Sequence, residues 1–506
     1  MTGRPAVTQS PDRSSSVKRS PFRPLVAIAA VAIGTSLVGA GGVAAATEGA
    51  ETTYLVLAPG TATAQAKARV AAAGGTVAAD YRQIGVVVAR STNPSFLSEV
   101  GGKGVEAAAS TAGLGTLLDE GETLDSLGSE QVTATDASGE PLYHLQWDMP
   151  QIHVADAHEV TTGEGVVVGV LDSGISSSHP DLASQIAYDK SASCLGGVAD
   201  RSESAWNPTT SDHGTHVAGT IAAAVNGVGV TGVAPGARVA SVKVVNDDGY
   251  IYPEAALCGF MWAADQGMDV TNNSYYIDPW QWNCRNDARQ RPVWQAVQRA
   301  IRYSQSKGVL NIASAGNSNV DLQHRFTDSG SPNDGSYPVE ERTINGACVV
   351  LPGQAPGVVT VSATGPTEKK SYYSSYGLGD VDVAAPGGDA RFRTQGATAT
   401  IADAILSTTW SAAKGNGWGY KQGTSMASPH AAGVAALALS AHPDLSAGSL
   451  AAALEETAQT LDCPDGVYNP TPLLPNGATR YEAVCYGGER NGFYGAGEVD
   501  ALAAVQ

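Results

Sequence analysis

Apolar residues in the larger part of the chain gather in short, nearly continuous runs that polar, glycine-rich segments separate. Runs of this kind, rich in β-branched residues, are typical of parallel strands buried on both faces. Five such runs are "GVVVGVLDSG" (165–174), "ARVASVKVV" (237–245), "MDVTNNS" (268–274), "GVLNIASAGN" (308–317) and "GVVTVSA" (357–363). Helix-like stretches lie between them, such as "HVAGTIAAAV" (216–225) and "PVWQAVQRAIRYSQSKG" (292–308). This alternation predicts an α/β fold with a mostly parallel central sheet.

The chain before this pattern divides into two parts. In residues 47–100, "TYLVLAPG" (53–60) and "RQIGVVVAR" (82–90) have the pattern of strands, and "AQAKARVAAAGG" (64–75) that of a helix stopped by glycine. These residues are predicted to form a small α+β domain. Residues 101–142 carry eight acidic residues against one lysine among many small residues, which predicts a solvated, flexible linker.

The first 46 residues have the features of an export signal. A basic stretch leads into an uncharged segment, 25–47, and Ala44-Ala45-Ala46 offers the small residues of a cleavage site. The alternative is an uncleaved membrane anchor, because 25–47 is long enough to cross a bilayer. We expect cleavage, secretion to the extracellular space and no stable membrane association afterwards, because glycine and alanine make the segment only weakly apolar.

Composition changes this picture in two respects. Residues 1–46 carry five cations and one anion, so the rest of the chain has a net charge of −23, which makes nucleic acid or anionic lipid an improbable partner. The chain has 43% hydrophobic and 16% charged residues, as globular proteins do, and its 59 glycines predict many tight turns.

The six cysteines fit an exported protein. They are even in number and none has the C-x-x-C spacing of a zinc ribbon, and six cysteines allow 15 pairings. The short local loop between Cys463 and Cys485 makes that one pair a hypothesis.

Four short segments contain residues that could act together in an acyl transfer. They are "VLDSGISSSHPDL" with Asp172, "DHGTHVAGT" with His213, "ASAGNSN" with Asn317 and "GTSMASPH" with Ser425. Serine attack on an amide requires a base, a group that orients the base, and donors for the developing oxyanion. Asp172 and Asn317 follow predicted parallel strands, whose carboxyl ends are where chemistry collects in such sheets.

Each segment taken alone has a simpler interpretation. Asp172 could cap the turn after a strand, Ser425 could cap a helix, and "AGN" could be a turn. His213 and His216 have the i, i+3 spacing of two metal ligands, but neither an H-E-x-x-H motif nor a third ligand is evident. Four such coincidences in one chain favour the catalytic interpretation.

These four blocks resemble those of the subtilisin family of serine endopeptidases, in which Asp, His and Ser follow one another in this order. The similarity extends over about 143–506, including the closing "GAGEVDALAAV" (495–505), and implies a three-layer subtilisin-like fold. The unit at 47–100 is similar to the family's inhibitory propeptide.

The resemblance implies a role for each matching residue. Ser425 would be the nucleophile, His213 its base and then the acid for the leaving amine, and Asp172 the group that orients the imidazole. Asn317 would donate its side-chain amide to the oxyanion beside the Ser425 N–H. In subtilisin itself, loss of that asparagine lowers turnover by a factor of ~10²–10³.

Substrate binding is also implied by the resemblance. The family binds the peptide backbone as an added strand between two segments, here Gly249 with its neighbours and "NSYY" (273–276), with Ser274 matching the family's serine. The family usually has glycine where Tyr276 falls, so the tyrosine could narrow the pocket. The alternative is that Tyr275 and Tyr276 only pack.

Two further features follow from the resemblance. Asp181 and Asn226 match positions that bind calcium in subtilisins, although Asp181 could equally cap a helix. Two segments, 276–292 and roughly 319–352, exceed the family's minimal plan and carry Cys284 and Cys348, which suggests a disulfide between them.

The sequence therefore predicts a secreted zymogen with a signal peptide (1–46), a propeptide domain (47–100), a linker with the maturation site (101–142) and a peptidase domain (143–506). Its substrates would be proteins or peptides, its own propeptide an intramolecular inhibitor, and no cofactor would be required for the chemistry. The alternatives are a secreted binding protein that kept the fold without activity, and a processing protease dedicated to one partner.

Overall fold

The computed structural model of the chain describes residues 51–111, 116–117, 122–123, 139–277, 281–324, 326–331, 339, 341–390, 400–470 and 481–506. The predicted signal peptide and most of the predicted linker lie outside the described residues. Among the described helices, none is both long and apolar enough to cross a membrane.

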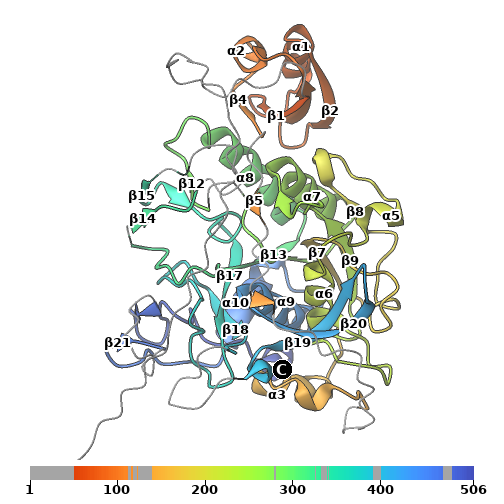
Figure 1. Ribbon diagram of the computed structural model, residues 1–506, viewed down its shortest axis with the longest axis vertical. Coiled ribbons are helices and arrows are strands. Elements are labelled where there is room, and N and C mark those ends of the chain that lie inside the picture. The colour runs from red at the N-terminus through yellow and green to blue at the C-terminus, as the bar shows by residue number, and fades with distance from the viewer. Residues whose placement is uncertain are drawn as a thin grey trace, which may run out of the picture. The chain divides into compact units, whose positions relative to one another are not determined.

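A seven-stranded sheet forms the centre of the structure (Figure 1), with strand order β18-β17-β13-β11-β7-β9-β8. All its strand pairs are parallel. Its strands are β7 (Val167–Asp172), β8 (Ala192–Ser193), β9 (Arg238–Lys243), β11 (Val270–Asn273), β13 (Leu310–Ser314), β17 (Val358–Thr364) and β18 (Val383–Pro386). Four of the seven lie within the predicted apolar runs and β17 extends one residue past its run, so the predicted α/β fold with a parallel sheet is confirmed.

Helices cover both faces of this sheet (Figure 1). Val170 of β7 belongs to an apolar cluster with α6, α9, α10 and α11, and its neighbour Leu171 belongs to a second cluster with α7 and α8. Successive residues of a strand point to opposite faces, so one continuous apolar run supplies both clusters. The helices are α6 (His213–Ala222), α7 (Pro253–Asp265), α8 (Arg291–Ser306), α9 (Thr424–Ala441), α10 (Ala447–Glu456) and α11 (Ala501–Val505).

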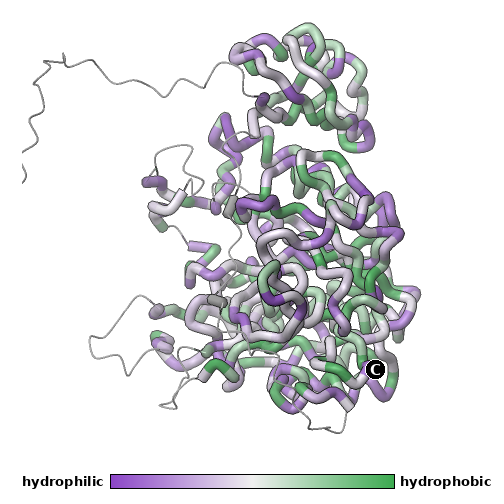
Figure 2. Tube along the Cα trace, turned by 45° about the vertical axis from the view of Figure 1, so that its right-hand side comes forward, coloured by the Kyte–Doolittle hydropathy of each residue, from purple (hydrophilic) through white to green (hydrophobic). Residues whose placement is uncertain are grey.

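Short elements connect these layers, and hydrophilic stretches mark many of the outer loops (Figure 2). The short helices are η1 (Tyr143–Leu145), α3 (Asp148–Gln151), α4 (Val154–Ala157), η2 (Leu195–Gly197), α5 (Glu203–Trp206) and η3 (Ile401–Asp403). The remaining strands of this part are β10 (Tyr250–Ile251), β12 (Asn283–Cys284), β14 (Phe326–Asp328), β15 (Arg342–Ile344), β16 (Cys348–Val349), β19 (Ile405–Ser411), β20 (Gly415–Gln422), β21 (Val467–Tyr468) and β22 (Ala483–Val484).

Residues 51–111, here called the amino-terminal module, contain an antiparallel sheet of order β2-β3-β1-β4 with two helices. The two predicted strands and the predicted helix are present. The elements are β1 (Thr52–Leu57), α1 (Ala64–Ala72), β2 (Gly75–Tyr81), β3 (Val86–Ser91), α2 (Phe96–Val100) and β4 (Ala107–Ser110). The module thus extends past residue 100.

The segment predicted as a solvated linker contains three strands. Besides β4, β5 (Thr116–Leu117) pairs with β10 and β6 (Glu122–Thr123) pairs with β20, both antiparallel. Backbone pairing with β1, β10 and β20 therefore orders these residues, and the role of the segment as a linker between two domains stays a prediction. Acidic, small-residue composition carries no information about such backbone pairing.

The amino-terminal module packs on α7 and α8. Six of its buried apolar residues share the cluster of these helices, namely Leu55, Leu57, Ile84, Val86, Val88 and Ala109. Arg299 on α8 donates from Nη1 to the carbonyls of Ala58 (3.1 Å) and Ile84 (3.3 Å), and from Nη2 to Glu106 (2.8 Å). The contact is therefore apolar at its centre with a charged anchor.

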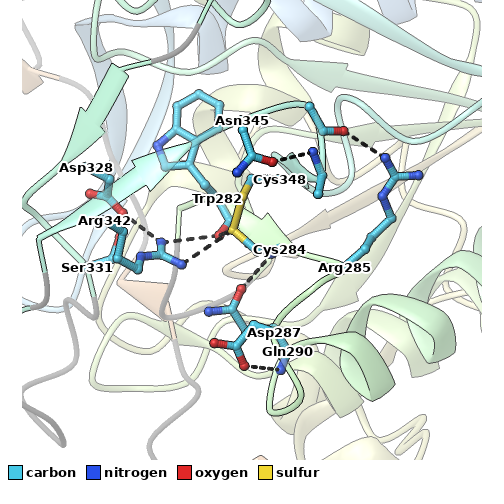
Figure 3. The surroundings of a disulfide bond; sticks show 12 residues. Trp282, Cys284, Arg285, Asp287, Gln290, Asp328, Ser331, Arg342, Asn345 and Cys348 are labelled. Atoms are coloured by element: carbon cyan, nitrogen blue, oxygen red, sulfur yellow. Dashed lines mark hydrogen bonds and ion pairs between the residues drawn. A yellow bond between two sulfur atoms is a disulfide. The ribbon is translucent and has the colours of Figure 1, made fainter.

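Three disulfides connect the six cysteines. The predicted pairs Cys463–Cys485 and Cys284–Cys348 are confirmed, and the third is Cys194–Cys258. Figure 3 shows Cys284–Cys348, which joins directly opposite residues of β12 and β16. Next to it, Arg342 donates to the Trp282 carbonyl (3.3 Å) and to Asp328 (2.7 Å), so one cation fastens the neighbouring loop.

Candidate active site

Asp172 and His213 form a fully buried pair. The Nδ1 atom of His213 lies 2.9 Å from Oδ1 and 3.0 Å from Oδ2 of Asp172, and neither side chain is exposed. A carboxylate facing Nδ1 keeps the proton on that nitrogen, which leaves Nε2 as the basic atom. The N–H of Ser173 donates to Asp172 Oδ1 (2.7 Å) and fixes the carboxylate.

Local sequence explains why these two residues meet. Strand β7 ends at Asp172, and Gly174 turns the chain away with φ of 104°. Helix α6 begins at His213, and a Cβ on Gly214 would lie 2.6 Å from the Gly174 carbonyl oxygen and 3.0 Å from Asp172 Cβ. Glycine at 214 therefore allows the helix to start directly against the end of the strand.

Ser425 is the second residue of α9, which packs against α6. The first-turn N–H groups of a helix have no acceptor within the helix, and the positive end of the dipole lies there. The Oγ of Ser425 donates to the carbonyl of Ser274 (3.2 Å), so the hydroxyl is held at the end of β11.

Pro429 lies in the second turn of α9, later than the first-turn position that the sequence suggested. Without an N–H it cannot bond to the carbonyl of Ser425. That carbonyl instead accepts the hydroxyl of Ser274 (2.9 Å). The proline therefore frees an acceptor that attaches the start of α9 to the neighbouring strand.

A buried polar chain continues this attachment. Asn272 donates to Ser274 Oγ (2.9 Å) and accepts from Ser428 Oγ (2.6 Å), and all three side chains are buried. Sequence analysis identified Ser274 but missed Asn272 and Ser428. Two adjacent asparagines in a buried strand were a usable signal, because buried amides require partners.

Asn317 follows β13 and faces the start of α9. Its Oδ1 accepts from the N–H of Thr424 (2.8 Å) and from Thr424 Oγ1 (2.9 Å). Since both contacts use the amide oxygen, the amide N–H₂ points the other way. An amide held in this orientation can donate to an oxyanion next to the Ser425 N–H.

The predicted substrate segments lie at two strand ends. Gly249 has φ of 84° in the turn before β10, which pairs with β5. Tyr275 is buried and donates its hydroxyl to Asn273 (3.0 Å), so its ring packs in the core. Burial, together with the charge of Asp172, raises its pKa well above the ordinary value. Tyr276 packs against the apolar cluster around the Cys284–Cys348 disulfide.

The residues predicted to bind calcium lie close together and involve a residue that the sequence analysis missed. Asp181 is fully buried, and its Oδ2 accepts from the Val230 N–H (3.1 Å) and Trp418 Nε1 (2.7 Å). Its Oδ1 has no hydrogen-bond partner among the described residues. Glu140 accepts from the N–H groups of Asn226 and Gly227.

This arrangement fits a hard cation. Burial raises the pKa of Asp181 to about 7, and the charge of Glu140 adds to the increase. Two carboxylates, the amide of Asn226 and the carbonyls of the 226–230 loop are the oxygen ligands that calcium prefers. No separate signal for Glu140 was present in the sequence, because it is one of the eight acidic residues of the predicted linker.

His216 takes no part in a metal cluster among the described residues. Its Nε2 lies 3.2 Å from the Ile405 carbonyl oxygen and 3.1 Å from that of Gly419. Burial lowers its pKa to about 3, so the ring is neutral near pH 7. The described part of the chain contains no group of three or more His, Cys, Asp or Glu side chains arranged to hold a metal.

Comparison with known proteins gives consistent results. The family model described as Subtilase family matches residues 163–487. Subtilisin DY of Bacillus licheniformis is 32% identical over 299 residues, which cover 59% of this chain and 85% of that protein. Fervidolysin of Fervidobacterium pennivorans is 29% identical over 338 residues, covering 63% of this chain and 41% of fervidolysin.

Solved structures share the fold. The crystal structure of fervidolysin, described as a keratinolytic enzyme related to subtilisin, has a TM-score of 0.63 at 24% identity and covers 91% of this chain and 61% of that one. A protease of Pseudoalteromonas arctica has a TM-score of 0.52 at 29% identity and covers 74% of this chain and 99% of its own. Since the family model spans more than half of the sequence, the chain belongs to the subtilase family and is a serine-type peptidase.

Proposed function

We propose that the protein is a secreted endopeptidase that hydrolyses peptide bonds through Ser425, His213 and Asp172, with Asn317 in the oxyanion hole. The observation that carries this proposal is the buried Asp172–His213 pair, with Nδ1 2.9 Å from the carboxylate, because His213 begins a helix that packs against the helix whose first turn holds Ser425. A buried carboxylate that faces Nδ1 is the arrangement that prepares an imidazole to act as a base.

The reaction follows from these positions. Ser425 Oγ attacks the carbonyl carbon of the substrate while its proton passes to His213 Nε2, and Asp172 stabilises the imidazolium that forms. The oxyanion accepts from the Asn317 amide and the Ser425 N–H. His213 then gives the proton to the leaving amine. In the second half of the reaction, His213 takes a proton from a water molecule that attacks the acyl-enzyme, and returns it to Ser425 Oγ as the acid product leaves.

The amino-terminal module would act as an inhibitory propeptide. Support comes from the two short strands that follow it: β5 pairs with β10 after Gly249, and β6 pairs with β20, which ends at Gln422 shortly before Ser425. Leu117 thus pairs next to the predicted substrate segment, and Glu122 pairs with the strand that leads into the nucleophile. We infer that the maturation cleavage falls in the predicted linker, 101–142.

Glu140, Asp181 and Asn226 would hold a structural calcium ion in the mature enzyme. When bound, the ion would neutralise two buried carboxylates and fix the 226–230 loop. This site requires that the maturation cleavage precedes Glu140, so that the carboxylate stays on the mature chain.

Tyr276 would border the pocket for the residue before the scissile bond. Its contact with the cluster around the Cys284–Cys348 disulfide supports a fixed ring position. A peptide library digested by the wild type and by Tyr276→Gly tests this role. The variant is expected to accept larger side chains at that position, and an unchanged preference contradicts the assignment.

A fluorophosphonate probe tests the catalytic proposal. Labelling of the mature protein should disappear in Ser425→Ala and persist in Ser440→Ala, a control serine at the far end of the same helix. Asn317→Ala should lower kcat sharply and leave KM nearly unchanged. Absence of labelling in the folded wild type would favour a binding protein without activity.

A further inference from the structure

A nearly buried ion pair connects the start of the helix that carries the proposed base to the strand that leads into the proposed nucleophile. Lys421 Nζ lies 2.9 Å from Asp212 Oδ1, and the side chains are only 2% and 19% exposed. Asp212 directly precedes His213 at the start of α6. Lys421 lies in β20, four residues before Ser425. Sequence analysis assigned no role to either residue.

The β19–β20 hairpin is bound to α6 along its length. Thr408 Oγ1 donates to the Thr215 carbonyl (2.7 Å) and Ser407 Oγ to the His216 carbonyl (2.8 Å). A Cβ on Gly219 would lie 2.2 Å from Thr408 Oγ1, so this glycine permits the close approach. These neutral contacts hold the third and fourth residues of the helix, and the ion pair holds Asp212, the residue directly before it.

The ion pair also balances charge next to the imidazole. Burial raises the pKa of Asp212, but Lys421 and the hydrogen bond from the Trp410 N–H outweigh it, so the pKa of this carboxyl lies below its ordinary value. The neighbouring His216 is neutral near pH 7 because burial and Lys421 lower its pKa. Asp212 and Lys421 are thus opposite charges that face His216, which in turn interacts with His213.

We propose that Lys421 is a positioning residue for catalysis: its ion pair with Asp212 holds the first turn of α6, and with it the ring of His213, against the strand that leads into Ser425. This inference rests on the proposed roles of His213 and Ser425. A positively charged anchor within β20 fixes both members of the catalytic pair with one contact. Misplacement by about 1 Å is enough to lower a rate by a factor of about 10².

The test uses the full-length enzyme after self-processing, with a fluorogenic peptide as substrate. Lys421→Met leaves the Asp212 carboxylate without its counter-charge and favours the imidazolium. The acid limb of the pH profile, meaning the pH at which kcat/KM falls to half its maximum on the acidic side, should then shift to a higher pH by about half a unit. Asp212→Asn leaves the Lys421 cation without its counter-charge and disfavours the imidazolium, so the acid limb should shift to a lower pH. In both variants kcat should fall about tenfold or more with little change in KM.

The double variant Asp212→Asn with Lys421→Met separates charge from position. Because both charges are gone, the acid limb of its pH profile should return to the wild-type position. Its kcat should stay low, because the contact that positions the helix is missing. Lys414→Met, at the exposed turn of the same hairpin, serves as the control and should leave both readouts unchanged. If Lys421→Met does not fold, Lys421→Arg keeps the charge, and its expected result is an unmoved limb with a reduced kcat.

Two results would overturn the proposal. One is a wild-type kcat and pH limb in both single variants. The other is a reduced kcat with an unchanged acid limb of the pH profile in both single variants, which would show that the ion pair only stabilises the fold. Failure of the proposed function is distinguishable, since an inactive wild type or an active Ser425→Ala would show it before any variant of the pair is compared.

Discussion

Glu254 lies in the first turn of α7, under the amino-terminal module, and provides a pH-dependent prediction. Its side chain is 5% exposed, and its Oε2 has no hydrogen-bond partner among the described residues. Burial raises its pKa to about 7. A hydrogen bond from Thr111 and the charge of Arg90, both in the module, lower the pKa but offset only part of this increase. The protonated carboxyl is therefore the form that fits the contact.

The sign and size of the effect follow from linkage. When the module leaves, Glu254 meets water and its pKa returns toward the ordinary value of 4.5. Binding of the module thus takes up a proton, so the complex is tightest below pH 4.5 and weakens as the pH rises to about 7. Since one pKa unit is a factor of ten in an equilibrium constant, the affinity should fall by about two orders of magnitude over this window.

The assay follows the onset of peptide hydrolysis after dilution of the self-processed complex, between pH 4.5 and 8, normalised to the activity of fully released enzyme. The wild type should activate faster toward pH 7, and Glu254→Gln should activate with little pH dependence. Glu456→Gln, on the exposed side of α10, is the matched control. If Glu254→Gln keeps the wild-type pH dependence, the carboxyl does not govern release.

Three further predictions concern named contacts. Arg299→Ala removes donors to two module carbonyls and the ion pair with Glu106, so the module should dissociate about tenfold faster or more, measured in the same assay. Ser274→Ala leaves the Ser425 carbonyl without its hydroxyl donor and should lower kcat about tenfold, measured by steady-state kinetics. Chelation by EDTA should lower the unfolding temperature of the mature enzyme, and Glu140→Gln should reduce that loss, measured by calorimetry.

Each of these has its own control. Arg291→Ala at the exposed start of α8 should not change release of the module, and equal rates for both arginine variants would contradict the anchor. Full activity of Ser274→Ala would show that the attachment of α9 to β11 is not required. For calcium, an unfolding temperature that EDTA leaves unchanged in the wild type would refute the site.

Five of the seven strands of the central sheet could be predicted from the sequence because each is a local apolar run. The same holds for Asp172 and Asn317, which follow such runs directly, and for the confirmed Cys463–Cys485 pair, whose members are close in the chain. The resemblance to subtilisins supplied the functional roles, because the four motifs are long and occur in one order. In each case the information lies within a few consecutive residues.

Other features depend on how distant segments meet. No local pattern shows that Lys421 reaches Asp212, that Ser274 fills the acceptor freed by Pro429, or that Glu140 joins Asp181. The linker composition likewise could not show that β5 and β6 pair with distant strands.

The sequence by itself determined the fold class, five of the seven strands of the central sheet and the candidate chemical groups, because periodicity and short motifs act locally. Only the tertiary structure decided where the side chains of Tyr275 and Tyr276 pack and which charged residues become buried together. The physical reason is that burial, strand register and the desolvation of a charge are properties of packed neighbours, and these neighbours come from segments far apart in the chain.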